Sequence, residues 1–151
     1  MRICRTRARL LEKHMQTIKI AAGPYHFVAR LESDKAPRTC ARFLTLLPLR
    51  DRIIHVRWSG EACWVPMGAT DLGLGAENAT RHPAPGEIIL YPGGVSETEL
   101  LIAYGGVAFA SKAGPLAGNH FLTIVEGSEN LATLGRQVLW QGAQPIVFER
   151  D

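Results

Sequence analysis

The sequence has few residues of the kinds that form disulfide frameworks or structural metal sites. Its three cysteines, Cys4, Cys40 and Cys63, are an odd number at wide spacing, with no Cys-x-x-Cys and no Cys/His pairing typical of structural zinc. We expect reduced thiols and no bound metal. No apolar run resembles a signal peptide or a transmembrane helix. These absences predict a soluble, cytoplasmic protein that does not interact with membranes.

Clustered positive charge is also missing from most of the chain. The formal charge of the chain is +3, but residues 1–14 alone carry +4, which leaves −1 for residues 15–151. A nearly neutral domain lacks the clustered positive charge that binds nucleic acid, so we exclude a nucleic-acid partner. Residues 1–14 are predicted to be a basic, poorly ordered N-terminal extension, and residues 15–151 a single domain.

Familiar catalytic signatures are absent as well. The chain contains no His-Glu-x-x-His, Gly-x-Ser-x-Gly or Ser-x-x-Lys motif. The run Gly73-Leu-Gly75 lacks the third glycine and the following helix of a dinucleotide-binding loop. The sequence therefore indicates no cofactor and no specific reaction.

The sequence does contain many short apolar runs separated by turn residues. Alternation over 16–22 and 25–31, joined by Gly23-Pro24, predicts a β-hairpin. Pro37 at a helix's first turn, followed by apolar residues at helical spacing, predicts a helix over 37–47 that ends at Pro48.

Residues 53–66 gather two of the three tryptophans with several reactive side chains in one strand-like window. Alternation predicts two faces, a core face with Ile54, Val56 and Trp58 and a displayed face with His55, Arg57 and Ser59. Gly60 allows a bend, which can turn Trp64 outward. If the chain has a site, we expect it here.

The second half of the chain predicts further strands. These are expected over residues 87–91, 99–104, 107–110, 119–126, 137–141 and 146–149. In 119–126, His120, Leu122 and Ile124 share one predicted face. Ser128 is a plausible N-cap and Gly135 a C-terminal stop for a second helix. Eight or nine short strands with two short helices favour a mainly β fold, a closed or nearly closed barrel of about eight strands capped by a helix at each end.

Three segments resemble the cyclophilins. They are the helix-opening Ala36-Pro37-Arg38-Thr39, the run from Gly114 to Phe121, and the passage from Leu134 to Gly142. The whole chain is still more similar to a bacterial family of small cyclophilin-like proteins of unknown function. The runs that carry this similarity are Arg57–Glu61, Glu77-Asn78, Pro85–Ile88, Tyr104-Gly105 and Gly118–Phe121. The resemblance implies a cyclophilin-like barrel without implying a reaction.

Weak peptidyl-prolyl cis-trans isomerase activity is the one reaction that the resemblance suggests. Arg57 is the best candidate for the catalytic arginine, although Val56 separates it from His55. The isomerase glutamine corresponds to His120, and the phenylalanine of the proline pocket corresponds to Leu122. The late histidine corresponds to Gln137. An isomerase holds the twisted amide in a dry slot beside a suitably placed donor, so these replacements place isomerase activity second.

Binding of a small polar metabolite or a peptide segment on the outer barrel face around Arg57 is the first hypothesis. The candidate ligand-binding residues are His55, Arg57, Glu61, Trp64, Glu77, Asn78, Tyr104, Asn119 and His120. The alternatives are a structural ion pair of Arg57 with Glu61 or Glu77, a structural His120, and an enzyme that uses His120 or Glu61 as acid or base. Edge strands, and apolar stretches such as residues 100–102, predict a homo-oligomer.

Overall fold

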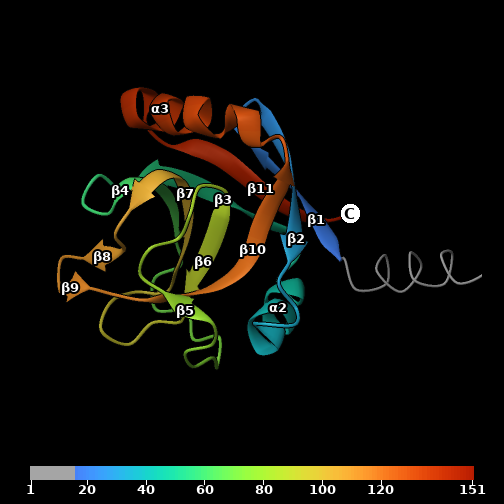
Figure 1. Cartoon of the computed structure of the whole chain (residues 1–151), viewed down its shortest axis with the longest axis vertical. Helices are drawn as coiled ribbons and strands as arrows, with labels where there is room; N and C mark the ends of the chain where they lie inside the picture. The colour runs from blue at the N-terminus through green and yellow to red at the C-terminus, as the bar shows by residue number, and fades with distance from the viewer. Residues whose placement is uncertain (1–15) are drawn as a thin grey trace, which may run out of the picture.

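A computed structural model describes residues 16–151, so the predicted N-terminal extension and Met15 lie outside the described residues. Eight antiparallel strands form the body of the molecule (Figure 1). Their bounds are β1 Thr17–Ala22, β2 Tyr25–Leu31, β3 Leu49–His55, β4 Gly60–Pro66, β6 Glu87–Tyr91, β7 Glu99–Val107, β10 Gly118–Glu126 and β11 Gln144–Arg150. Three two-residue strands, β5 Ala79–Thr80, β8 Ala110–Ser111 and β9 Gly114–Pro115, lie outside this set.

The eight long strands close into a barrel. Their order is β2-β1-β11-β3-β4-β7-β6-β10, and β10 pairs again with β2, so that Leu122 faces Leu31 and Thr123 faces Arg30. Closure leaves none of these strands as an open edge. The predicted closed barrel of about eight strands is confirmed.

One helix covers each end of the barrel (Figure 1). Helix α2, Pro37–Leu44, begins at the predicted proline but ends three residues before the predicted limit at 47. Helix α3, Leu131–Gln141, follows a 3₁₀ turn, η1 Ser128–Asn130. No helix within residues 16–151 is long and apolar enough to cross a membrane.

Three predictions for the second helix are wrong. Gly135 lies inside α3, and residues 137–141 continue the helix instead of forming a strand. Ser128 makes no capping side-chain hydrogen bond, and Gly127 occupies the N-cap of the 3₁₀ turn. Gly135 is required by close packing, because a Cβ atom there would overlap the ring of Tyr104.

The barrel interior holds the main core. Phe43 from α2 makes edge-on contacts with Phe121 and Phe148, with ring centroids 4.9 and 5.4 Å apart. A second, smaller apolar cluster contains Val56, Ala62, Ile89, Tyr91, Leu101 and Phe109. On β7, Leu100 and Ile102 belong to the interior cluster while Leu101 belongs to the second one. Because alternate residues face opposite sides of a strand, the second cluster lies on the outer barrel face.

The predicted strand over 53–59 is interrupted. Strand β3 ends at His55, and residues 56–59 form the turn to β4, held by a bond from the Ser59 amide to the Val56 carbonyl. The turn breaks the alternation, so Trp58 is 59% exposed and Ser59 is buried. The core assignment of Trp58 and the displayed assignment of Ser59 are therefore wrong.

Strand β10 also departs from simple alternation. A register shift between His120 and Leu122 leaves Phe121 and Leu122 both fully buried. The predicted shared face of His120 and Leu122 is therefore wrong, because a β-bulge separates them.

Candidate functional site

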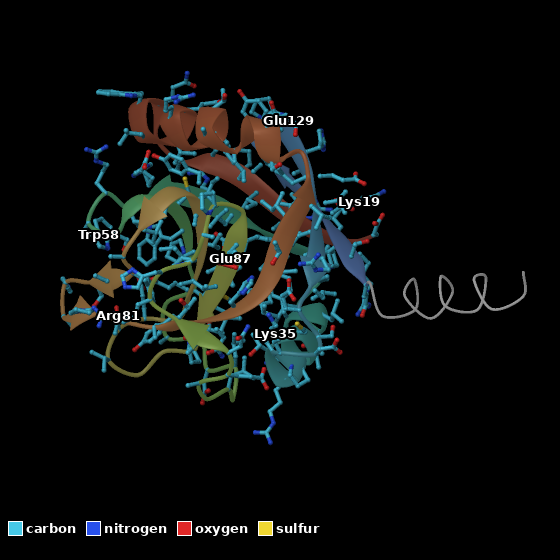
Figure 2. The ribbon with its side chains drawn as sticks, viewed as in Figure 1. Lys19, Lys35, Trp58, Arg81, Glu87 and Glu129 are labelled. Carbon is cyan, nitrogen blue, oxygen red and sulfur yellow. The ribbon has the colours of Figure 1, made fainter. Side chains whose placement is uncertain are left out.

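Most of the side chains predicted from the sequence fall into two groups. One group is at the β3, β4 and β7 strands around His55, and the other is at β5, β10 and α2 around Asn119. Figure 2 shows the labelled Trp58, beside the first group, at the edge of the molecule, whereas Glu87, the partner of His120, lies near the centre of the view.

The first group is built on a short hydrogen bond between His55 and Tyr104. The Nε2 atom of His55 lies 2.6 Å from the Tyr104 hydroxyl, and the two rings meet edge to face. Burial and, to a smaller extent, Arg57 lower the pKa of His55, although Glu61 opposes them. Burial also raises the pKa of Tyr104. Both side chains are therefore neutral near pH 7.

The charged members of the first group lie at its edge. Glu61 accepts a hydrogen bond from the Gly106 amide at 3.1 Å. Arg57 is exposed in the turn and forms no ion pair within the described residues. The guanidinium of Arg57 is thus available to a ligand, whereas the carboxylate of Glu61 already supports the end of β7.

The second group anchors the start of helix α2. Glu77 accepts hydrogen bonds from the Thr39 amide at 2.9 Å, the Thr39 hydroxyl at 2.8 Å and the Arg38 amide at 3.3 Å. Asn119 is buried and joins the Glu77 amide to Thr39 and the Gly75 carbonyl. Asn78 adopts a φ of 50° and donates to the carbonyl of His120. These contacts are those of a fold-stabilising network.

Removing the Glu77 carboxylate should destabilise the protein. Helix α2 has no capping side chain at Ala36, so Glu77 satisfies two of its first amides, and Glu77→Ala should cost about 1–2 kcal/mol. Burial opposes ionisation, but the bonds from Thr39 and Arg38 outweigh it and lower the pKa of Glu77 below 4.5. The contribution is therefore present above pH 4.5 and lost as the pH falls through the lowered pKa.

Urea denaturation at pH 7 and at pH 3 measures this effect. The exposed Glu129, which has no side-chain hydrogen bond in the described structure, supplies the control variant Glu129→Gln. Equal stability of Glu77→Ala and wild type at pH 7 would show that the cap contributes nothing.

His120 is held by both ring nitrogens. Its Nδ1 lies 3.3 Å from a Glu87 oxygen and its Nε2 2.8 Å from the Thr123 hydroxyl. Thr123 in turn donates to Glu32 at 2.8 Å, and Glu32 pairs with Arg30 at 2.8 Å. The chain of contacts ties β10 to β6 and β2 and leaves His120 no free nitrogen for a metal. Among residues 16–151, no group of His, Cys, Asp or Glu is arranged to hold a metal ion.

A cavity of about 450 Å³ adjoins the second apolar cluster on the outer face of the barrel. Of the nine predicted site residues, Trp64 alone lines it. The other side chains that matter for its chemistry are Trp58, Glu97, Glu99, Ser111 and Lys112. They come from the β3–β4 turn, the start of β7, and the segment at β8.

Glu99 is the unusual member of this cavity. It is 5% exposed and makes no side-chain hydrogen bond or ion pair with the residues that the structure describes. Burial, followed by the nearby charge of Glu97, raises the pKa of Glu99 to about 8. A buried carboxyl with a raised pKa in a cavity marks a candidate functional site. The sequence offered one signal for it, because alternation along 99–103 places Glu99 on the same side as Leu101 and Ala103.

Two tryptophans form the aromatic wall of the cavity. The rings of Trp58 and Trp64 have centroids 6.1 Å apart and planes at 81°. The indole Nε1–H of Trp64 is buried and lacks a hydrogen-bond partner in the described part of the chain. Such an unpaired donor costs about 1–3 kcal/mol, and native proteins rarely keep one without a function or a bound molecule.

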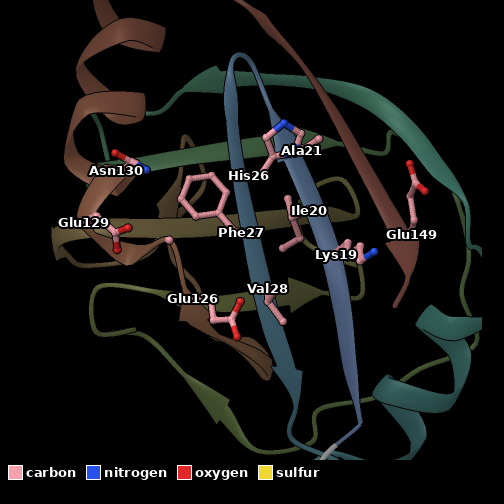
Figure 3. A pocket seen from close by; sticks show the side chains of 11 residues that line it. Lys19, Ile20, Ala21, His26, Phe27, Val28, Glu126, Glu129, Asn130 and Glu149 are labelled. Carbon is pink, nitrogen blue, oxygen red and sulfur yellow. The ribbon is translucent and has the colours of Figure 1, made fainter.

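A larger cavity of about 650 Å³ has a different character. Figure 3 shows Glu126 and Glu129 on one side of the β1–β2 hairpin and Lys19 and Glu149 on the other. All four side chains are exposed, and Lys19 lies 3.8 Å from Asp151. This hollow is a solvated surface over the hairpin, and none of its charged groups is buried. The smaller cavity, which is lined by Trp58, Trp64 and Glu99, is therefore the better candidate for the functional site.

The closed eight-stranded barrel with a helix at each end is a cyclophilin-like fold. The family described as "Protein of unknown function (DUF3830)" matches residues 18–149, so the chain belongs to this family. No curated protein matches the chain.

Solved structures agree with the fold. McbB, solved in complex with tryptophan, is 18% identical with a TM-score of 0.65 over 89% of this chain, which spans only 44% of McbB. A hypothetical protein from Archaeoglobus fulgidus is 15% identical with a TM-score of 0.62, and the match covers 91% of this chain and 96% of the archaeal protein. A cyclophilin-type peptidyl-prolyl cis-trans isomerase from Cryptosporidium parvum is 15% identical with a TM-score of 0.53, and the match covers 91% of this chain and 99% of the isomerase. At these identities the similarity concerns the fold alone.

Proposed function

We propose that this protein binds a small molecule on the outer face of the barrel, in the cavity formed by Trp58, Trp64 and Glu99. The observation that carries the proposal is the buried carboxyl of Glu99, which has no partner among the described residues and faces a cavity with two tryptophans. A volume of about 450 Å³ lies in the usual range for small-molecule sites. The exposed Arg57 precedes Trp58 in the chain and forms no ion pair within the described residues.

The ligand is a compact metabolite with an aromatic or apolar body and polar groups at its edge. The tryptophans supply apolar contact, and Glu99, Ser111 and Lys112 supply hydrogen-bonding groups. McbB was solved with tryptophan bound, so tryptophan and its relatives belong in any ligand panel.

Prolyl isomerisation is less well supported as a function of this barrel. Leu122, which stands in place of the isomerase's pocket phenylalanine, is fully buried in the interior cluster and offers no outer surface to a proline ring. His120 is already engaged through both nitrogens, by a hydrogen bond with Thr123 and an ion-pair contact with Glu87. The isomerase hypothesis rests on the resemblance and on Arg57.

Thermal shift measurements with a panel of aromatic and polar metabolites, tryptophan included, test the proposed function. A ligand at a concentration of 100 times its Kd should raise the Tm by about 5–10 °C. Trp58→Ala should remove most of this rise, and Arg57→Ala should weaken it.

Trp140→Ala is the matched control, because Trp140 is 82% exposed on α3 and undergoes the same chemical change away from the cavity. The same ligand response in Trp58→Ala and in Trp140→Ala would place the ligand elsewhere. A panel without any shift would argue against the proposed function itself.

A further inference from the structure

The charges around the cavity favour a positively charged ligand. Glu97 and Glu99 line it from one segment, against the single ammonium of Lys112. Lys112 forms no ion pair with either carboxylate in the described structure. Glu99 therefore has no cationic partner of its own, although a buried carboxylate is stable only when it is paired.

The aromatic wall favours the same kind of ligand. The faces of indole rings carry negative electrostatic potential and attract cations more strongly than other aromatic side chains do. Trp58 and Trp64 meet almost at a right angle, so they form a corner that presents two aromatic surfaces. Trp58 is more than half exposed, which leaves part of its ring open to a ligand.

We infer that the cavity recognises an organic ammonium ion attached to a compact aromatic or apolar body, with the ammonium on the Glu99 carboxylate and the body against Trp58 and Trp64. This inference rests on the proposed function and specifies its ligand class. The experiment distinguishes two competing possibilities: an anion held by Lys112, or an uncharged ligand that accepts a hydrogen bond from the protonated carboxyl of Glu99.

Binding of an ammonium ion should depend on pH through Glu99. The carboxyl must lose its O–H proton to the buffer before the ion pair forms, and its pKa is about 8 in the free protein. Three titratable groups face Glu99. They are Glu97 two residues before it, Tyr91 opposite it on β6, and Lys112 just after β8. Affinity for the ammonium should therefore rise with pH up to about pH 8 and level off above it.

Isothermal titration calorimetry with three indoles of different charge tests the inference. The probes are tryptamine, which is a cation, 3-ethylindole, which is neutral, and indole-3-propionate, which is an anion. At pH 8.5 tryptamine should bind at least tenfold more tightly than either of the others. Its affinity should fall at least tenfold at pH 6.5, whereas the affinity of 3-ethylindole should stay constant.

Two variants make the test specific to Glu99. Glu99→Gln keeps the size and polarity of the side chain, and it should remove both the preference for tryptamine and its pH dependence. Retained binding of 3-ethylindole would show that this variant still folds and keeps the cavity. Glu97→Gln changes an exposed carboxylate two residues earlier in the chain and should retain more than half of the preference.

The outcomes separate the two claims. Equal or tighter binding of 3-ethylindole or indole-3-propionate at pH 8.5 would overturn the ammonium inference while leaving the proposed binding function intact. A preference for tryptamine that survives in Glu99→Gln would also overturn it. Failure of all three indoles to bind would overturn the inference, and the wider metabolite panel would then decide the proposed function.

Discussion

Glu99→Gln should stabilise the protein at pH 9 and leave its stability nearly unchanged at pH 5. The pKa of Glu99 is about 8 in the folded protein against 4.5 for the free group, so the folded state holds a proton that the unfolded state releases. Stability is therefore lost as the pH rises from 4.5 to 8. The pKa difference corresponds to at most about 5 kcal/mol, and we expect a gain of about 2–4 kcal/mol for Gln at pH 9.

Urea denaturation of both proteins between pH 5 and pH 9 measures this gain. The difference between variant and wild type isolates Glu99, because all other groups titrate in both proteins. Glu97→Gln is the control, since Glu97 is exposed and contributes only the smaller part of the shift. A constant difference across the pH range would show that Glu99 ionises in the folded protein as it does in water.

Gly135→Ala should destabilise the protein by about 1–3 kcal/mol, although alanine is the better helix former by about 1 kcal/mol. The added Cβ atom would overlap the ring of Tyr104, and the hydroxyl of that ring is held by His55 at 2.6 Å. The ring cannot move aside without breaking this hydrogen bond. Steric overlap therefore outweighs helix propensity.

A double-mutant cycle with Tyr104→Ala checks this cause. In the Tyr104→Ala background the obstructing ring is gone, so Gly135→Ala should become neutral or slightly stabilising. Thermal or urea denaturation of the four proteins gives the coupling energy. If Gly135→Ala alone raised the stability, the close packing of α3 on Tyr104 would be refuted.

The barrel could be predicted because its strands are encoded locally. The alternation over 16–22 and 25–31 and the run over 87–91 were found in the structure at nearly the predicted bounds. The features that were predicted wrongly depend on contacts between distant segments. Gly135 has the sequence position of a helix stop, but Tyr104 determines its role, and Trp58 follows the alternation of a strand that ends at His55.

The candidate site was predictable only in part for the same reason. Trp64 is a predicted site residue because it follows the bend at Gly60, and it lines the cavity. Glu99 is not among the predicted site residues, because a single glutamate at the start of an apolar strand normally marks a solvated strand end. Its burial depends on β4 and the segment at β8, which the sequence alone does not place beside it.

The three tryptophans offer the most direct test of the proposed site. Each has one indole N–H resonance in a ¹⁵N-labelled sample, and Trp58 and Trp64 line the cavity while Trp140 lies on α3. During a tryptamine titration at pH 8.5, we predict saturable shifts of the Trp58 and Trp64 resonances with that of Trp140 unchanged. Shifts confined to Trp140, or no shift at millimolar tryptamine, would contradict the account.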